Sequence, residues 1–373
     1  MMRRLIWFAR WIAMAAKELK VVLLDKRART TLIISPIVQL LLYGMASTLE
    51  VKNVDVGVVN RDNGVASQEI LSGLAGSGNI RTIKYYTSLA ALSEGIKQRE
   101  VLVGMSLPPD LSRDVAAGRT ATVGLVVDGR KINAGQIVAE YMDRITRRAG
   151  ADLRPAYARD GPELVAVNWY NPNLDYRWFT MPALIAVVCS VLVISVSVHT
   201  FAREREAGTI DTLQMLPITP GQKLLGKIMP AFLVGLFNAT LFVMIIPLVF
   251  GVPLIGSLGL LLVAVIAFSL ALAGVGTAIS TVSQTQQQAF LIGFMVITPL
   301  TLLAGFATPI DNMPQWLQSV AWLNPLRHML EVSHGAFLKD LPARFALENI
   351  VMMLAFAGFF LTIAYVNIWR RFD

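Results

Sequence analysis

One segment of the chain contains residues whose types and spacing could bind a nucleotide. Residues 221–227 (GQKLLGK) match the first seven positions of the phosphate-binding loop G-x-x-x-x-G-K-[ST], in which backbone amides and a lysine hold phosphate groups. The eighth position is Ile228, which has no hydroxyl to bind magnesium, and the pattern predicts no strand before the segment and a membrane span after it. We therefore expect no nucleotide here, so any ATPase must be a separate chain.

The three histidines are the other candidates for chemistry, but neither H-E-x-x-H nor G-x-S-x-G occurs. His328 and His334 lie on either side of Glu331, which would allow a metal site, although a hydrogen-bonded pair is the favoured interpretation. His199 lies in an apolar stretch, where packing is favoured over contact with a partner helix or a substrate. The single Cys189 excludes an intrachain disulfide and is expected to be a packing residue. We assign no catalytic residue and no metal site.

The composition of the chain is that of a membrane protein. Of its 373 residues, 55% are hydrophobic and only 16% are charged. Because a helix needs about 20 apolar residues to cross the hydrocarbon core of a bilayer, charge-free stretches of that length indicate spans. The longest stretch, residues 228–310, has room for three spans, with breaks at 251–256 and 283–288. We predict an α-helical polytopic membrane protein with six transmembrane helices, near residues 30–49, 179–201, 228–250, 257–281, 289–308 and 349–369.

The distribution of charge predicts how these helices are oriented. Residues 3–29, 203–227 and 370–373 together contain 14 lysines and arginines against 6 acidic residues, and 14 − 6 gives the whole net charge of +8. Loops rich in Lys and Arg face the cytoplasm. We therefore expect both termini and the segment 202–227 to be cytoplasmic, and residues 50–176 to be periplasmic or extracellular. The basic charge reflects topology, and we do not expect nucleic-acid binding.

The spacing of the first 27 residues predicts an amphipathic helix before the first span, 28–49. Apolar side chains recur at helical intervals, at Leu5, Phe8, Ile12, Ala16, Leu19 and Leu23. Arg3, Arg10 and Lys17 lie on the opposite side. This pattern favours a helix that lies in the cytoplasmic surface of the bilayer. A cytosolic helix packed on a partner protein is the alternative.

Strand-like and helix-like segments alternate in residues 50–176, between the first two spans. Strands are predicted at 54–59, 80–86, 101–106 and 122–127, and helices at 63–74, 88–98, 109–117 and 131–149. Such alternation, with turn residues between the segments, is typical of a compact α/β domain. Several of these strands are rich in valine, as strands buried on both faces are.

The polar segment 202–227, which we call the elbow, connects the second and third spans. Gly208 would end the helix of the second span, and Thr209 would cap a two-turn helix at 210–216, with Asp211 in its first turn. Two prolines would end this helix, Pro217 and Pro220. A rigid helix held between two spans could transmit a push from a cytosolic partner. A solvated loop that only sets topology is the alternative.

A second outer segment, 308–348, lies late in the transmembrane domain 177–373. Its prolines and tryptophans predict short helices on or in the outer leaflet. Within the six predicted spans only His199 can be ionised, whereas transporters driven by protons bury acidic or basic groups there. An external energy source and an apolar or amphipathic substrate fit this composition.

Several motifs, taken in order, resemble those of permease subunits of bacterial type-2 ATP-binding-cassette (ABC) exporters with a large extracytoplasmic domain. Residues 206–217 are similar to the family's coupling pattern E-x-G-T-x-x-x-L-x-x-x-P. The ATPase-coupling residues that this match implies are Glu204, Arg205, Glu206, Gly208, Thr209, Leu213 and Pro217. Residues 314–317 and 323–326 resemble the family's outer helices, and imply an outer gate or re-entrant segment with Trp316, Asn324 and Pro325. Further matches are Lys17-Glu18-Leu19 and Asn171-Pro172, so the resemblance covers nearly the whole chain.

The resemblance implies a complex of two six-span subunits, alike or different, with two cytosolic ABC ATPase subunits. ATP and magnesium would bind to those ATPase chains, and this chain would bind no cofactor of its own. Closure of the ATPase pair on ATP would be transmitted by the helix 209–216. A periplasmic membrane-fusion adaptor often joins such relatives, whose location is the bacterial inner membrane and whose substrates include drugs and lipids.

Two other functions stay open on the sequence alone. A non-transporting receptor or scaffold would use its extracytoplasmic domain to bind a ligand, and it would not need the elbow. A membrane-embedded enzyme is disfavoured, because no paired acid, base or metal set faces a span. Copurification of an ATPase distinguishes a transporter from both alternatives.

Overall fold

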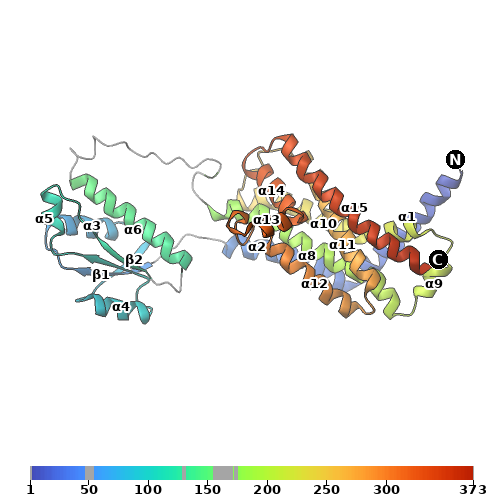
Figure 1. The fold of residues 1–373 in the computed structure, drawn as a ribbon, viewed down its shortest axis with the longest axis horizontal. Coiled ribbons are helices and arrows are strands. Elements are labelled where there is room, and N and C mark those ends of the chain that lie inside the picture. Colours follow the sequence, from blue (N-terminus) through green and yellow to red (C-terminus); the bar gives the residue numbers. More distant parts are fainter. Residues whose placement is uncertain (1, 47–53, 128–131, 154–170, 172–174, 373) are drawn as a thin grey trace. The chain divides into compact units, whose positions relative to one another are not determined.

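The described residues fall into two compact units. The computed structural model describes residues 2–46, 54–127, 132–153, 171 and 175–372. We call the unit within 1–47 and 168–373 the membrane unit, and the unit within 48–167 the α/β unit (Figure 1). Each has its own hydrophobic core and is described by itself.

Long apolar helices form the membrane unit, as predicted. Among the described residues, five helices are long and apolar enough to cross a bilayer. They are α2 (Lys26–Ala46), α8 (Tyr176–Glu206), α10 (Pro220–Phe250), α11 (Leu258–Val282) and α15 (Ala343–Phe372). The predicted fifth span is α12 (Gln286–Leu302), whose 17 residues lie at the lower limit for a span. It ends before the predicted residue 308, because the chain turns after Leu302 and reaches Gly305 at φ +91°.

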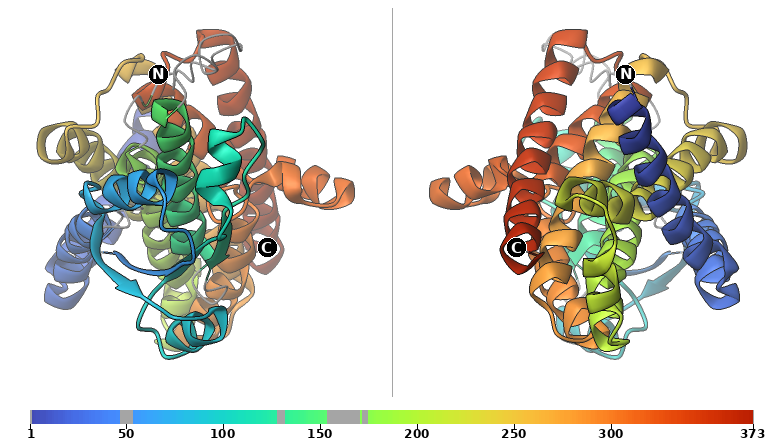
Figure 2. Two further views of the ribbon diagram at one scale, coloured as in Figure 1. Left: turned by 90° about the vertical axis from the view of Figure 1, so that its left-hand side faces the viewer. Right: turned by 90° about the vertical axis from the view of Figure 1, so that its right-hand side faces the viewer.

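Shorter helices lie at the two ends of the membrane unit. The beginning of α1 (Met2–Leu24), the end of α15 and the short α9 (Ile210–Met215) share one end, which faces the viewer in the right panel of Figure 2. The helices α13 (Gln315–Trp322) and α14 (Pro325–Leu338) lie at the other end, after a single turn of 3₁₀-helix at Ile310–Asn312 (Figure 1). This arrangement agrees with an elbow and two termini on the same side of a membrane.

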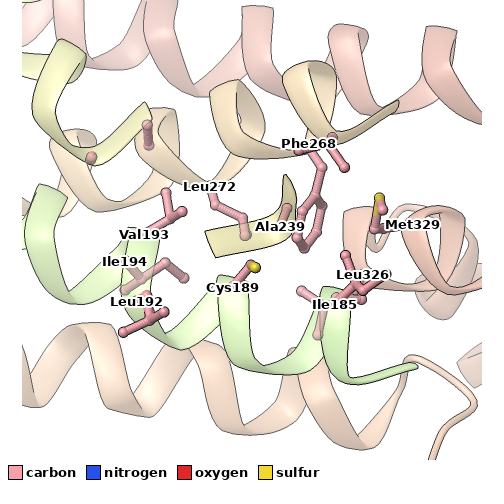
Figure 3. Packing of buried hydrophobic residues seen from close by; sticks show 14 of the residues in the cluster. Ile185, Cys189, Leu192, Val193, Ile194, Ala239, Phe268, Leu272, Leu326 and Met329 are labelled. Atoms are coloured by element: carbon pink, nitrogen blue, oxygen red, sulfur yellow. The ribbon is translucent and has the colours of Figure 1, made fainter. Parts of the chain in front are cut away.

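The helix α8 is at the centre of the membrane unit, where α10, α11, α12 and α14 all pack against it. Figure 3 shows its Ile185, Cys189 and Val193 among side chains of α10, α11 and α14. Cys189 is a fully buried packing residue, as predicted. Small residues bring the helices close: a β-carbon at Gly276 of α11 would lie 1.8 Å from the Ser197 hydroxyl of α8.

The α/β unit contains a four-stranded sheet in the order β2-β1-β3-β4, in which β4 alone is antiparallel to its neighbour. The strands are β1 (Val54–Asn60), β2 (Ile80–Tyr85), β3 (Val103–Leu107) and β4 (Gly124–Val127). The helices are α3 (Val65–Ala75), α4 (Leu89–Lys97), α5 (Leu111–Ala116) and α6 (Ile132–Leu153). All eight predicted elements are present, each within a few residues of its predicted position.

The two central strands of this sheet, β1 and β3, are buried on both faces, which explains their valines. On one face Val56, Val58 and Val103 pack with α3 and α6, and on the other Leu92 of α4 packs with Val59. The Asp62 carboxylate, after β1, accepts hydrogen bonds from the hydroxyl and the backbone N–H of Ser112, and thereby joins α5 to the strand.

Candidate functional site

The elbow connects α8 to α10 through one left-handed glycine and the two-turn helix α9. Gly208 follows the end of α8 and has φ +69°, a conformation that favours glycine. A β-carbon there would meet no atom within 4 Å, so the backbone conformation and not lack of space requires glycine. At the other side, Thr219 and Gln222 form a capping box that begins α10. The predicted helix stop at Gly208 is thus confirmed.

Two details of the predicted elbow are wrong. The Thr209 side chain does not cap α9; its hydroxyl donates instead to the Glu204 carboxylate, a stronger charge-assisted bond. Pro220 does not end α9, which stops at Met215, but occupies the first turn of α10, where its missing N–H leaves no bond unmade. Asp211 lies in the first turn of α9, as predicted.

Buried charges meet where α1, α8 and α10 pack together. The Lys227 ammonium of α10 lies 3.0 Å from the carboxylate of Glu18 in α1 and 3.0 Å from that of Glu204 in α8. Lys17 contacts the same two carboxylates at 2.9 and 2.8 Å, and Arg203 reaches Glu18 at 3.4 Å. We call these five residues the ion cluster; its three cations and two anions leave one net positive charge.

Lys227 is the centre of this cluster, because its side chain is 0% exposed and all its hydrogen-bonding capacity is used. An ammonium has three N–H donors. Here they go to Glu18, to Glu204 and to the backbone carbonyl of Thr200, each at 3.0 Å. The Phe201 ring lies 5.4 Å from the ammonium. A buried ion pair whose groups are all bonded is costly to break, since loss of one partner leaves the other charge buried alone.

Lys17 closes the cluster from the solvent side, with half of its side chain exposed. Burial lowers the pKa of Lys17, but hydrogen bonds and charges from Glu204 and Glu18 outweigh burial and raise its pKa above the ordinary value. The lysine therefore stays charged over the physiological range and ties α1 to the end of α8.

The two residues after Glu204 bind two further helices. The Arg205 guanidinium donates to the carbonyls of Thr281, at 3.0 Å, and Ser283, at the C-terminal end of α11. The Glu206 carboxylate accepts from the backbone N–H of Gln286, at 2.7 Å, where α12 begins. A cation at a helix C-terminus and an anion at an N-terminus both complement the helix dipole. Residues 204–206 thus fasten the end of α8 to α1, α10, α11 and α12.

The helix α9 has a buried and an exposed side. Leu213 is 4% exposed and packs into the core of the membrane unit. Met215 is 85% exposed, the largest value for a large hydrophobic residue among those described, and Leu216 beside it is 45% exposed. Pro217 follows, and its carbonyl accepts from the Arg10 guanidinium of α1 at 2.6 Å.

The outer residues Trp316, Asn324 and Pro325 lie apart from the elbow, at the other end of the membrane unit (Figure 1). Trp316 is 69% exposed on α13. Asn324 is buried and caps α14, while its amide donates to the carbonyl of Leu300 in α12 at 2.6 Å. Pro325 occupies the first turn of α14.

His199 packs against an aromatic ring, as favoured from the sequence, whereas His328 and His334 are each hydrogen-bonded, but to different partners. His328 contacts the Asn349 side chain at 2.6 Å and the Trp322 carbonyl at 2.7 Å. His334 contacts the Phe179 carbonyl at 2.8 Å and stacks on that ring, and His199 stacks on Phe290. Within the described part of the chain, no group of three or more His, Cys, Asp or Glu residues could hold a metal.

The sequence pattern does not reveal the roles of Glu18 and Lys227 in the ion cluster. Both residues had been noticed only as parts of motifs, Glu18 in the N-terminal match and Lys227 in the nucleotide-like segment. One signal was available: Lys227 is the last charged residue before 83 uncharged ones, a position where burial demands a partner. Which acid it would meet, 209 residues away in the case of Glu18, could not be read from spacing.

Comparison with known proteins identifies related chains along nearly the whole length. The family model described as ABC-2 family transporter protein matches residues 26–366. The probable multidrug ABC transporter permease YbhR of Escherichia coli (strain K12) is 36% identical over 334 residues, which are 89% of this chain and 91% of YbhR. From the same organism, the probable multidrug ABC transporter permease YbhS is 25% identical over 97% of both chains. The inner membrane transport permease YhhJ is 27% identical over 73% of this chain and 74% of its own.

Proposed function

The chain belongs to the ABC-2 family, as a non-catalytic transmembrane permease subunit, and from this premise we propose that it exports an apolar or amphipathic substrate. The substrate would leave the cytoplasm or the inner leaflet of the membrane. ATPase subunits in separate chains would supply the energy, so ATP and magnesium would bind there and not here.

The construction of the elbow is the observation that carries this proposal. A coupling element must be rigid toward its own chain and accessible to its partner. Glu204, Arg205 and Glu206 bond the end of α8 to four other helices, whereas Met215 of α9 is 85% exposed. An exposed methionine is well suited to an interface, because its flexible side chain adapts to the partner surface.

The proposed sequence of events follows from these contacts. ATP binding closes the two ATPase subunits, and their closure pushes on α9. Because Gly208 and the Thr209–Glu204 hydrogen bond join α9 closely to α8, the push reaches the end of α8. The ion cluster then moves α1 and α10 with it, and Arg205 and Glu206 move the junction of α11 and α12. A pathway between these helices would open toward the outside.

The proposed topology places the elbow and both termini in the cytoplasm and the α/β unit outside, in the bacterial inner membrane. The excess of Lys and Arg at the end that contains α9 supports this orientation. Its proposed partners are cytosolic ABC ATPases, a second permease subunit of the same or a homologous kind, and a periplasmic membrane-fusion adaptor. Three of the proposed coupling residues, Leu213, Thr209 and Pro217, would act through their contacts with other residues of this chain.

The proposed substrate class rests on the apolar core of the membrane unit. Its buried residues are mostly apolar, and the buried charged groups among those described, Glu18, Glu204, Lys223 and Lys227, lie near the elbow. Such surroundings favour substrates that carry little charge. The names of YbhR and YbhS, probable multidrug permeases, are consistent with a drug-like or lipid-like substrate.

Purification from the native membrane in mild detergent tests this proposal. An ABC ATPase subunit should copurify with the chain, and its ATP hydrolysis should rise when uncharged apolar dyes or lipids are added. A preparation without any ATPase would contradict the proposed function and favour a receptor or scaffold.

A further inference from the structure

Two adjoining cavities lie in the α/β unit, which takes no part in the proposed coupling. The first has a volume of about 250 Å³ and lies between α3, α5, α6 and the segment before β4. The second, of about 480 Å³, lies beside it between α6 and the strands β3 and β4. Ala121, Val123 and Thr146 line both, so the two adjoin along α6, and we call them together the cleft. Clefts of roughly 300 to 1,000 Å³ commonly hold small ligands.

The first cavity is mostly apolar and is lined by several small residues. Its walls consist mainly of aliphatic side chains and of residues with little or no side chain, namely Ala66, Ile70, Leu111, Val115, Gly118, Ala121, Val123, Ala149, Gly150 and Leu153. A β-carbon at Gly150 of α6 would meet no atom within 4 Å. A mostly apolar pocket with a few polar groups is the usual setting for a small ligand.

The second cavity is polar at its rim. Thr120, Thr122 and Thr146 line it together with Asp143 and Arg147. The two charged residues pair with each other at 2.8 Å, and Arg119 at the first cavity pairs with Asp114, so neither cavity presents a net charge. The cleft therefore offers an apolar end and a hydroxyl-rich end of balanced charge.

We propose that this cleft binds a single-tailed amphiphile with an uncharged or zwitterionic head group. The tail lies in the first cavity, against Ile70, Val115 and Leu153, and the head lies among the threonines of the second. Binding of the amphiphile follows from the lining of the cleft. The use of the cleft, which is to receive an exported amphiphile outside the membrane, rests on the proposed function.

Photolabelling of the full-length protein in detergent-free nanodiscs tests the binding. The probe is an alkyl maltoside with a diazirine in its chain, and labelled peptides are mapped by mass spectrometry. We expect saturable labelling within residues 111–123 and 142–153, competed by unlabelled alkyl maltoside. An alkyl sulfate and an alkylammonium salt of the same chain length should compete at least tenfold less well, because the rim is neutral. Equal competition by either charged analogue would overturn the head-group assignment.

Filling the cleft gives the decisive variant. Gly150→Phe adds a ring at the wall of the first cavity, where a β-carbon meets no atom within 4 Å, and should reduce labelling of these peptides at least tenfold. Gly78→Phe is the matched control, since its β-carbon also meets no atom within 4 Å and Gly78 lies outside the cleft. Gly150→Leu, a strong helix former, fills the same space with less bulk and should act in the same direction. Labelling of the membrane spans serves as an internal standard in all variants.

The outcomes separate the cleft from the transport proposal. Absent labelling in the cleft, or labelling that Gly150→Phe and Gly150→Leu leave unchanged, overturns the binding site whatever the ATPase result. Saturable labelling without a copurifying ATPase leaves the site standing and contradicts export. If both hold, Gly150→Phe should also lower ATP-driven transport of the amphiphile several-fold while the ATPase subunit still copurifies.

Discussion

The buried side of the elbow, which we call its inner side, and the solvent-exposed side, which we call its outer side, are built in opposite ways. On the inner side, charged groups are buried, fully hydrogen-bonded and shared among α1, α8 and α10, with Lys227 at the centre. On the outer side, α9 exposes an uncharged apolar surface at Met215 and Leu216. At these positions the usual distribution, with apolar groups inside and charged groups outside, is reversed. Such a reversal suits a lever, which needs specific, directional bonds to its own frame and an adaptable surface for the part that pushes it.

The largest effect is expected when Lys227, at the centre of the ion cluster, loses its charge. Lys227→Met would leave the buried Glu18 and Glu204 carboxylates with only Lys17 and Arg203 as partners and would remove the donor to the Thr200 carbonyl, so we expect a loss of about 3 kcal/mol in the free energy of unfolding. Thermal unfolding in detergent measures it. Lys20→Met, on an exposed position of α1, is the control and should change stability little. Equal stability of both variants would mean that the ion cluster does not hold these helices together.

The connection between the two sides can be altered at Gly208. Gly208→Val forces a β-branched residue into the left-handed region, at a cost of about 1–3 kcal/mol. We expect the variant to assemble with the ATPase and hydrolyse ATP but to transport several-fold less substrate. Gly208→Asn, which tolerates this conformation, should retain transport. Normal transport by the valine variant would show that the connection need not be stiff.

The outer side is probed at Met215. Met215→Asp removes an exposed apolar contact and should weaken binding of the ATPase by about 1–2 kcal/mol, roughly 5- to 30-fold, with stability unchanged within about 0.5 kcal/mol. Titration of the purified ATPase subunit onto the permease in nanodiscs measures the affinity. Met215→Leu should bind as the original does. A loss of stability with unchanged affinity would assign Met215 to the fold.

The smallest effect is expected at the bond to α12. Glu206→Gln keeps an acceptor for the Gln286 N–H but removes the charge at the helix N-terminus, which should cost about 0.3–1 kcal/mol. Glu94→Gln, on an exposed position in the α/β unit, controls for loss of a surface charge. A salt titration sharpens the result, since the difference should shrink as ionic strength rises.

Most of the fold could be predicted from the sequence because local patterns determine it. Alternating strands and helices between residues 54 and 153 carry their own turn signals, and charge-free stretches mark the spans. The helix stop at Gly208 was also local.

The ion cluster could not be predicted in the same way. Three of its ion pairs join residues 185 to 209 positions apart, among them Lys17 with Glu204 and Glu18 with Lys227. The wrong cap at Thr209 has a more local cause, because the Glu204 carboxylate five residues earlier accepts the bond from its hydroxyl; the position of that carboxylate is in turn fixed by the ion cluster. Spacing along the chain contains no information on such tertiary partners.

Site-specific photocrosslinking tests directly whether α9 contacts the ATPase. A diazirine amino acid is introduced at position 215, on the outer side of α9, or at position 213, on its buried side, and the membranes are illuminated with and without ATP. We expect crosslinks from position 215 to an ABC ATPase chain, and from position 213 only to the permease itself. Crosslinks to the ATPase from 213 but not from 215, or from neither position, would contradict the assignment of α9 as the element that receives the push.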